Sequence, residues 1–235
     1  MMNFRYFVPS PKIEIVVARY NENIEWLRDD PFNKYSTIIY NKGESDIQKF
    51  GKITKIVQLN NVGRCDGSFL HHIVTNYDHL STITLFFPGS LNIAMKYKKA
   101  VQLVNEIELY KDTVFIGARC SNVQENLYGF LLDEWASTDT DNYKRNPESI
   151  LTPANIRPFG KWYQNKFGNL KTTYVSYAGI LGIHKKDILK RPKSFYEKLL
   201  EEVNVSSNPE VGHYIERSWQ AIFDNFSNAK CIQFL

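Results

Sequence analysis

The sequence predicts an α/β protein built on a mostly parallel or mixed sheet with helices on both faces. Short runs of β-branched residues recur through the first half of the chain, and segments with helical spacing separate them. This alternation, over about 115 residues, is typical of βαβ units. The first run, Lys12 to Ala18, is nearly continuously apolar, as expected of a strand buried on both faces.

Further elements follow in alternating order. The predicted strands lie at 36–41, 52–59, 82–87 and 113–117, and the predicted helices comprise a short one capped by Asn23, one over 68–77 and one over 92–109. Pro88 and Gly89 stop the strand at 82–87 because neither residue continues a ladder well. In open α/β sheets, ligands bind outside the carboxyl ends of the strands. The loops after the early strands are therefore the first place to look for a site.

The second half of the chain has a different character. Residues 121–158 are polar and weakly periodic, too long for a simple connection, and indicate a functional loop or an irregular subdomain. An aromatic segment at 158–163, a strand-like run at 173–183 and helices at 194–203 and 209–226 follow. We expect one domain over residues 1–235.

Composition limits the classes of partner. There are 29 Lys and Arg against 25 Asp and Glu, a net charge of +4, with no polybasic run that would follow a nucleic-acid backbone. No apolar run is long enough for a membrane span, and the N-terminal residues lack the apolar core of a signal peptide. Cys65, Cys120 and Cys231 are widely spaced and fit reduced thiols. We expect a cytoplasmic protein without nucleic-acid partners.

The loop after the first strand is the first candidate site. Ala18, Arg19, Tyr20 and Asn21 stand where a nucleotide base and ribose could lie at the sheet edge. A guanidinium such as that of Arg19 suits a diphosphate through paired hydrogen bonds. The alternative interpretation is a solvated turn whose polar residues only cap the next helix.

The second candidate is the glycine-containing segment 61–67 before a predicted helix. Its glycines let a ligand approach the backbone, and a helix N-terminus with Arg64 favours an anion. The spacing matches neither the P-loop nor the dinucleotide fingerprint. Asp66 has a competing interpretation as the N-cap of that helix.

Polar residues on the last predicted helix form another candidate. Glu210, His213, Glu216 and Arg217 recur at spacings of three and four and predict a polar stripe. Carboxylate and imidazole groups facing a cleft can serve as a base or as cation ligands. The alternative is a structural pair of Glu216 with Arg217.

Two other groups have structural interpretations that compete with functional ones. Trp162 and Tyr163 can stack on a sugar ring or belong to the core. Asp139 and Asp141 have the spacing of a cation site but lie in a polar segment with no strand before them, which favours a solvated loop.

Several segments taken in order resemble a family of fungal, bacterial, algal and large-DNA-virus proteins related to GT-A glycosyltransferases, including those encoded by viruses of algae. The resemblance spans about Ile13 to Phe223, and it is carried by segments at 16–27, 61–78, 84–90, 158–163 and 208–219. It implies a GT-A fold, with residues 1–118 as the nucleotide-binding half and 119–235 as the acceptor-side half.

The resemblance also implies an activity. The chain would transfer a sugar, most plausibly from a UDP-hexose, to a hydroxyl of a glycan or glycoprotein, as a hexosyltransferase in glycan biosynthesis or viral glycosylation. A divalent cation, Mn²⁺ or Mg²⁺, would assist. Carried over by position, Ala18, Arg19, Tyr20 and Asn21 would meet the nucleotide, Arg64 and Asp66 would lie near the diphosphate, and Pro88, Gly89 and Ser90 would occupy the place of the usual acidic motif. From the polar stripe of the last helix, we expect His213 to contact the nucleotide-sugar and Glu216 to be the base if the enzyme inverts.

The sequence departs from the family pattern after the strand at 82–87. Metal-dependent GT-A enzymes carry an Asp-x-Asp motif there, and this chain has Pro88, Gly89 and Ser90 instead. The metal ligands are therefore unknown. The rival interpretation is a non-catalytic nucleotide-sugar-binding or carbohydrate-binding module on a degenerate GT-A scaffold.

Overall fold

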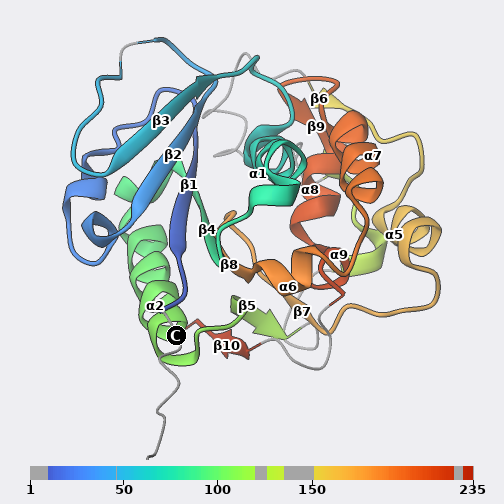
Figure 1. Ribbon diagram of the computed structural model, residues 1–235. Coiled ribbons are helices and arrows are strands. Elements are labelled where there is room, and N and C mark those ends of the chain that lie inside the picture. Colours follow the sequence, from blue (N-terminus) through green and yellow to red (C-terminus); the bar gives the residue numbers. More distant parts are fainter. Residues whose placement is uncertain (1–9, 46, 120–125, 135–150, 225–229, 235) are drawn as a thin grey trace, which may run out of the picture.

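The computed structural model describes residues 10–45, 47–119, 126–134, 151–224 and 230–234, and it shows an α/β architecture (Figure 1). The main sheet has the strand order β10-β5-β8-β4-β1-β2-β3, and β7 pairs with β5 beside this path. These strands are β1 (Ile13–Arg19), β2 (Ser36–Asn41), β3 (Ile53–Gln58), β4 (Ile83–Pro88), β5 (Val114–Arg119), β7 (Tyr174–Val175), β8 (Leu181–His184) and β10 (Lys230–Gln233). The short strands β6 (Leu151–Thr152) and β9 (Asn208–Pro209) form a separate pair.

The seven-strand path is mixed but mostly parallel. The pairs β1 with β2, β1 with β4, β2 with β3 and β5 with β10 are parallel, whereas β8 is antiparallel to both β4 and β5. The five strands predicted in the first half are confirmed to within two residues at each end. In β1, Val16 and Val17 point to opposite faces and both are fully buried, which is why this run reads as continuously apolar.

Helices cover both faces of the sheet, as predicted (Figure 1). They are α1 (Arg64–Thr75), α2 (Ala94–Tyr110), α5 (Phe159–Phe167), α6 (Lys185–Ile188), α7 (Lys193–Val203), α8 (Glu210–Glu216) and α9 (Trp219–Ile222), with 3-10 turns η1 (Glu25–Arg28), η2 (Phe32–Lys34), η3 (Tyr77–His79), η4 (Gly89–Asn92) and η6 (Leu127–Gly129). One core joins Val16 and Phe86 to α1, α5, α7, α8 and α9, and the other joins Val17 and Phe87 to α2 and η1.

Three predicted elements differ from the structure. The helix after the first strand is only the 3-10 turn η1, because the residue before Pro31 is disfavoured in helical geometry. The helix at 209–226 is broken between α8 and α9, where the Ser218 hydroxyl donates to the carbonyl of Tyr214 at 2.7 Å. The run at 173–183 divides into β7 and β8 because Ala178 and Gly179 both have positive φ.

The aromatic segment at 158–163 belongs to the core. It opens helix α5, and Trp162 and Tyr163 are 0% and 2% exposed. The sugar-stacking interpretation of these two side chains is therefore wrong. Most of the predicted irregular loop, including Asp139 and Asp141, lies outside the described residues.

Both halves of the chain build one sheet. β8 and β10 come from the second half, and β8 is inserted between β4 and β5 from the first. Among the described residues, no helix is long and apolar enough to cross a membrane.

Candidate functional site

The N-terminus of α1 follows β3 and forms the base of the candidate site. The N-cap is Gly63, with φ of 72°, and a Cβ there would lie 2.6 Å from Oδ1 of Asn204, so only glycine fits. The interpretation of Asp66 as N-cap is wrong, because Asp66 lies within the first turn. The helix is 12 residues long, and its N-terminus contributes partial positive charge.

Lys42 holds the loop that leads into α1. It directly follows β2, and its ammonium donates to the backbone carbonyls of Val62 and Arg64. Burial lowers the pKa of Lys42 to about 8. The loop between β3 and α1 is thereby tied to the end of β2.

Arg64 joins α1 to the distant α8. Its Nη1 lies 2.9 Å from Oδ1 of Asn208 and 2.9 Å from Nε2 of His213. A guanidinium can only donate, so Nε2 of His213 accepts and the proton of the neutral imidazole is on Nδ1. Burial, reinforced by Arg64 and Arg217, holds the pKa of His213 well below its usual value.

Two carboxylates lie beside this network, Asp66 on α1 and Glu216 at the end of α8. Asp66 is 1% exposed, and its Oδ1 has no hydrogen-bond partner within the described part of the chain. Burial, together with the nearby Glu216 carboxylate, raises the pKa of Asp66 to about 7, although Arg64 opposes this shift. Near neutral pH the pair therefore exists with Asp66 partly protonated.

α8 comes close to α1 because Gly212 has no side chain at the contact. A Cβ on Gly212 would lie 3.3 Å from Cδ of Arg64 and 3.8 Å from Oδ2 of Asp66. Cys65 is part of the same cluster, with its Sγ 3.6 Å from Oδ2 of Asp66. Burial and the two carboxylates raise the pKa of the Cys65 thiol, so it stays protonated.

A strained turn between β7 and β8 orients Glu216. The backbone N–H of Ala178 donates to Oε1 of Glu216 at 2.7 Å, and Ala178 has φ of 75°. The buried Lys99 of α2 donates to the carbonyl of Tyr177 at 2.6 Å, which holds the turn from the other side. Burial lowers the pKa of Lys99 to about 8, while the Glu216 charge acts in the opposite direction. Lys99 is thus a buried cation close to the candidate base.

The predicted stop after the fourth strand forms the turn η4. Pro88 ends β4 and is buried, like Gly89, and Ser90 is half-buried. Lys96 donates to Oγ of Ser90 at 2.8 Å, and its charge acts on the Cys65 thiol. Lys96 therefore links the η4 turn to the cluster of Cys65 and Asp66 through its hydrogen bond and its charge.

In the loop after β1, most polar groups bind other parts of the protein. Arg19 is 6% exposed, and it donates from Nη1 to Oδ1 of Asn41 at 3.0 Å and from Nε to the carbonyl of Glu22 at 2.8 Å. Oδ1 of Asn21 accepts from the N–H of Glu44 at 2.9 Å. Of the predicted nucleotide-contacting residues here, Ala18 is buried and Tyr20 is 42% exposed. These hydrogen bonds hold the loop to the rest of the protein, and Tyr20 and Asn21 are exposed at its surface.

Not all of the predicted polar stripe faces the site. Glu210 is fully buried and accepts from the N–H of Leu132 and of Ala154, each at 2.8 Å. Arg157 pairs with the same carboxylate at 2.7 Å. Glu210 therefore joins the segments 126–134 and 151–158 to α8 and has a structural role. The Arg217 guanidinium lies 3.5 Å from the ring centroid of Phe130, and its Nη1 donates to the carbonyl of His213 at 3.1 Å.

Sequence reasoning missed Lys42, Lys96 and Lys99. The signal that was available is weak: Lys99 lies among the apolar positions of its helix, where a lysine is unusual. Within the described residues, no three His, Cys, Asp or Glu side chains come together as a metal-ligand group. Asp66 and Glu216 therefore have no third carboxylate, imidazole or thiolate beside them, within the described residues, that would complete a metal-ligand group.

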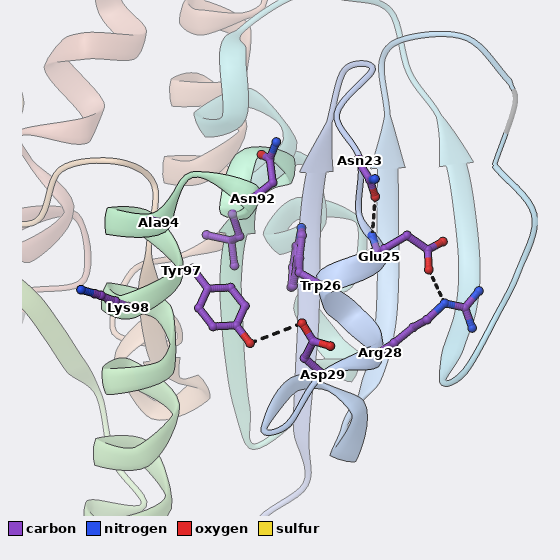
Figure 2. A pocket seen from close by; sticks show the side chains of 10 residues that line it. Asn23, Glu25, Trp26, Arg28, Asp29, Asn92, Ala94, Tyr97 and Lys98 are labelled. Carbon is purple, nitrogen blue, oxygen red and sulfur yellow. Dashed lines mark hydrogen bonds and ion pairs between the residues drawn. The ribbon is translucent and has the colours of Figure 1, made fainter.

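An open pocket of about 560 Å³ lies on the other side of η4 (Figure 2). Its walls come from the loop after β1, from η1, from η4 and from the first turns of α2. The lining residues are Asn23, Glu25, Trp26, Arg28, Asp29, Leu91, Asn92, Ala94, Tyr97 and Lys98. None of the predicted site residues lines it.

Comparison with curated proteins gives no match. Comparison with family models gives a match over residues 15–234, a range that runs from within β1 to beyond β10 and includes all the residues of the candidate site. Its description is a protein of unknown function, so it adds no activity to what the geometry shows. The chain belongs to the protein family of unknown function DUF3431.

Proposed function

We propose that the chain is a glycosyltransferase that moves a sugar from a nucleoside-diphosphate donor, most plausibly a UDP-hexose, to a hydroxyl of a glycan or glycoprotein. The α/β sheet would then be a GT-A variant. One observation carries the proposal: the α1 N-terminus with Arg64, and the carboxylates Asp66 and Glu216, meet beside the turn that follows β4. A helix N-terminus with cations suits a diphosphate, and a carboxylate suits proton transfer.

In this reaction the bond between the sugar C1 and the diphosphate oxygen breaks, and a bond forms between C1 and the acceptor oxygen. Glu216 takes the acceptor proton if the reaction inverts the anomeric centre; its Oε1 is already fixed by the N–H of Ala178. The positive charges of Arg64 and Lys96, together with the α1 N-terminus, would stabilise the negative charge that develops on the leaving diphosphate.

A divalent cation, Mn²⁺ or Mg²⁺, is part of the proposal. Oδ1 of Asp66, which has no hydrogen-bond partner within the described residues, would hold the cation, and oxygens of the nucleotide-sugar would supply further ligands. When bound, the cation would neutralise charge on the leaving diphosphate. Because Pro88, Gly89 and Ser90 stand at the end of β4 in place of an acidic motif, this turn supplies no carboxylate ligand.

The same departure supports a second candidate function, a non-catalytic module that binds nucleotide-sugars or carbohydrates. β4 ends in Phe86, Phe87 and Pro88, all buried, where a catalytic Asp-x-Asp motif would present carboxylates. A scaffold that has lost these groups can retain binding without turnover.

Donor hydrolysis separates the two candidates. Purified chain is incubated with a panel of nucleotide-sugars in Mn²⁺, in Mg²⁺ and in chelator, and release of nucleoside diphosphate is measured. We expect Glu216→Gln to lower turnover by about 10² to 10⁴ while donor binding persists. Glu197→Gln, at an exposed position on α7, is the matched control. Binding without turnover supports the module, and neither binding nor turnover contradicts both candidates.

A further inference from the structure

We propose that the pocket beside η4 is a binding site for a neutral oligosaccharide. Its volume of about 560 Å³ lies within the range of small-molecule sites, and its open shape suits a ligand that extends past the rim. Binding is inferred from the pocket alone; only its use as the acceptor subsite rests on the proposed glycosyl transfer.

The floor of the pocket is aromatic and rigid. The Trp26 Nε1–H donates to the carbonyl of Gly89 at 3.0 Å, and its ring packs edge-on against Phe32 and Phe87 with centroid distances of 5.1 and 6.1 Å. Tyr97 stands opposite Trp26 (Figure 2). Aromatic and aliphatic surfaces suit the C–H faces of sugar rings, and a preformed floor reduces the entropy lost on binding.

Short polar side chains provide both donors and acceptors at the rim. Oδ1 of Asn23 accepts from the N–H of Glu25 at 2.8 Å, and the amide nitrogen of Asn23 makes no hydrogen bond within the described part of the chain. The exposed Asp29 carboxylate accepts from the Tyr97 hydroxyl at 3.4 Å and retains capacity for other donors. Asn92 adds an exposed amide. Adjacent hydroxyls of a sugar need this combination of amide and carboxylate.

The charge of the lining favours an uncharged ligand. Glu25 and Asp29 balance Arg28 and Lys98, and Glu25 is already paired with Arg28. A nucleotide or an acidic peptide would need an excess of cations, and a basic peptide an excess of carboxylates. A balanced rim around an aromatic floor is suited to a polyhydroxyl compound.

η4 separates this pocket from the candidate site. Leu91 and Asn92 line the pocket, while Ser90 of the same short turn accepts from Lys96, whose charge acts on the Cys65 thiol of the other cluster. A saccharide bound here would lie next to the end of β4.

Isothermal titration and saturation-transfer NMR with the full chain test the inference, in the absence of any nucleotide-sugar. The probes are neutral gluco-, galacto-, manno- and xylo-oligosaccharides of two to four units. We expect at least one of these oligosaccharides to bind. Tyr97→Ala and Asp29→Asn should each weaken the affinity for that oligosaccharide about tenfold. The matched controls are Tyr110→Ala, an exposed tyrosine on the same helix, and Asp30→Asn, the neighbouring aspartate; both residues lie outside the pocket and should leave binding unchanged.

Failure of this inference can be told apart from failure of the proposed transfer. No binding of any probe at about 10 mM, or equal binding by wild type and the two pocket variants, overturns the saccharide site. Saccharide binding that depends on Tyr97, without turnover of any donor, supports the pocket and contradicts only the transferase. Turnover without Tyr97-dependent binding contradicts only the pocket.

Discussion

Arg64 Nη1 donates to His213 Nε2 at 2.9 Å, and the two residues are 149 positions apart in the chain. The contact joins the first turn of α1 to α8 and leaves the imidazole neutral. Asp66, two residues after Arg64 on α1, interacts electrostatically with Glu216 of α8. The candidate site therefore depends on a long-range interaction between a partly buried arginine and a buried histidine.

Arg64→Lys tests this contact. A lysine keeps the charge but loses the planar fork, so it cannot satisfy Asn208 and His213 together, and we expect the free energy of unfolding to fall by about 1–3 kcal/mol. Urea denaturation measures the change. Arg28→Lys, in an exposed pair with Glu25, is the control and should shift stability by less than about 1 kcal/mol. Equal effects of the two substitutions would contradict the buried role of Arg64.

Glu210→Gln should be among the more destabilising single changes. It removes the charge that pairs with Arg157 and places an amide NH₂ against one of two backbone N–H groups, at a cost of about 3 kcal/mol. Thermal and urea unfolding report the loss. Glu197→Gln, whose partner Lys193 lies 4.0 Å away at the surface, should cost no more than about 0.5 kcal/mol. A mild effect at Glu210 would mean that segments 126–134 and 151–158 do not depend on it.

The turn between β7 and β8 predicts opposite effects at neighbouring positions. Ala178 has φ of 75°, so Ala178→Gly should raise the free energy of unfolding by about 0.5–1 kcal/mol. Gly179→Ala should lower it by at least about 1 kcal/mol, because φ is 62° and a Cβ would lie 3.0 Å from Sγ of Cys65. Denaturant titrations of both variants check the signs, and the same sign for both would contradict this geometry.

His72 predicts an acid-dependent loss of stability. It is 1% exposed, and burial, with smaller effects from His71 and Lys55, lowers the pKa of His72 to about 4. As the pH falls below about 6.5, His72 is protonated in the unfolded chain but stays neutral in the folded chain. The free energy of unfolding therefore falls by about 3 kcal/mol between pH 6.5 and 4. His72→Gln should remove that part of the pH dependence in urea titrations across this range.

The control is His79→Gln, at an exposed position in η3, which should keep the wild-type profile. If wild type and His72→Gln lose stability in parallel on acidification, the buried neutral imidazole is not the cause.

Local patterns predicted most of the first half. The runs that became β1 to β5 are apolar over their own length, and α2 and α7 begin and end within two residues of the predicted bounds. The predictions were weaker where one sequence pattern was compatible with two structural interpretations. For Trp162 and Tyr163 the sequence favoured the core over a sugar platform without excluding the platform, and the packing of α5 against α8 decided for the core.

The sequence by itself determined the strands β1 to β5, the helices α2 and α7, and that glycines and polar residues gather after the early strands. Only the tertiary structure decided that β8 enters the sheet between β4 and β5 and that Glu210 binds the backbone of distant segments. It also decided that Glu216 binds the turn at Ala178, which the buried Lys99 holds from the other side. The physical reason is that periodicity reports the face on which a side chain lies. The identity of its partner depends on the packing of elements distant in sequence, which no local pattern contains.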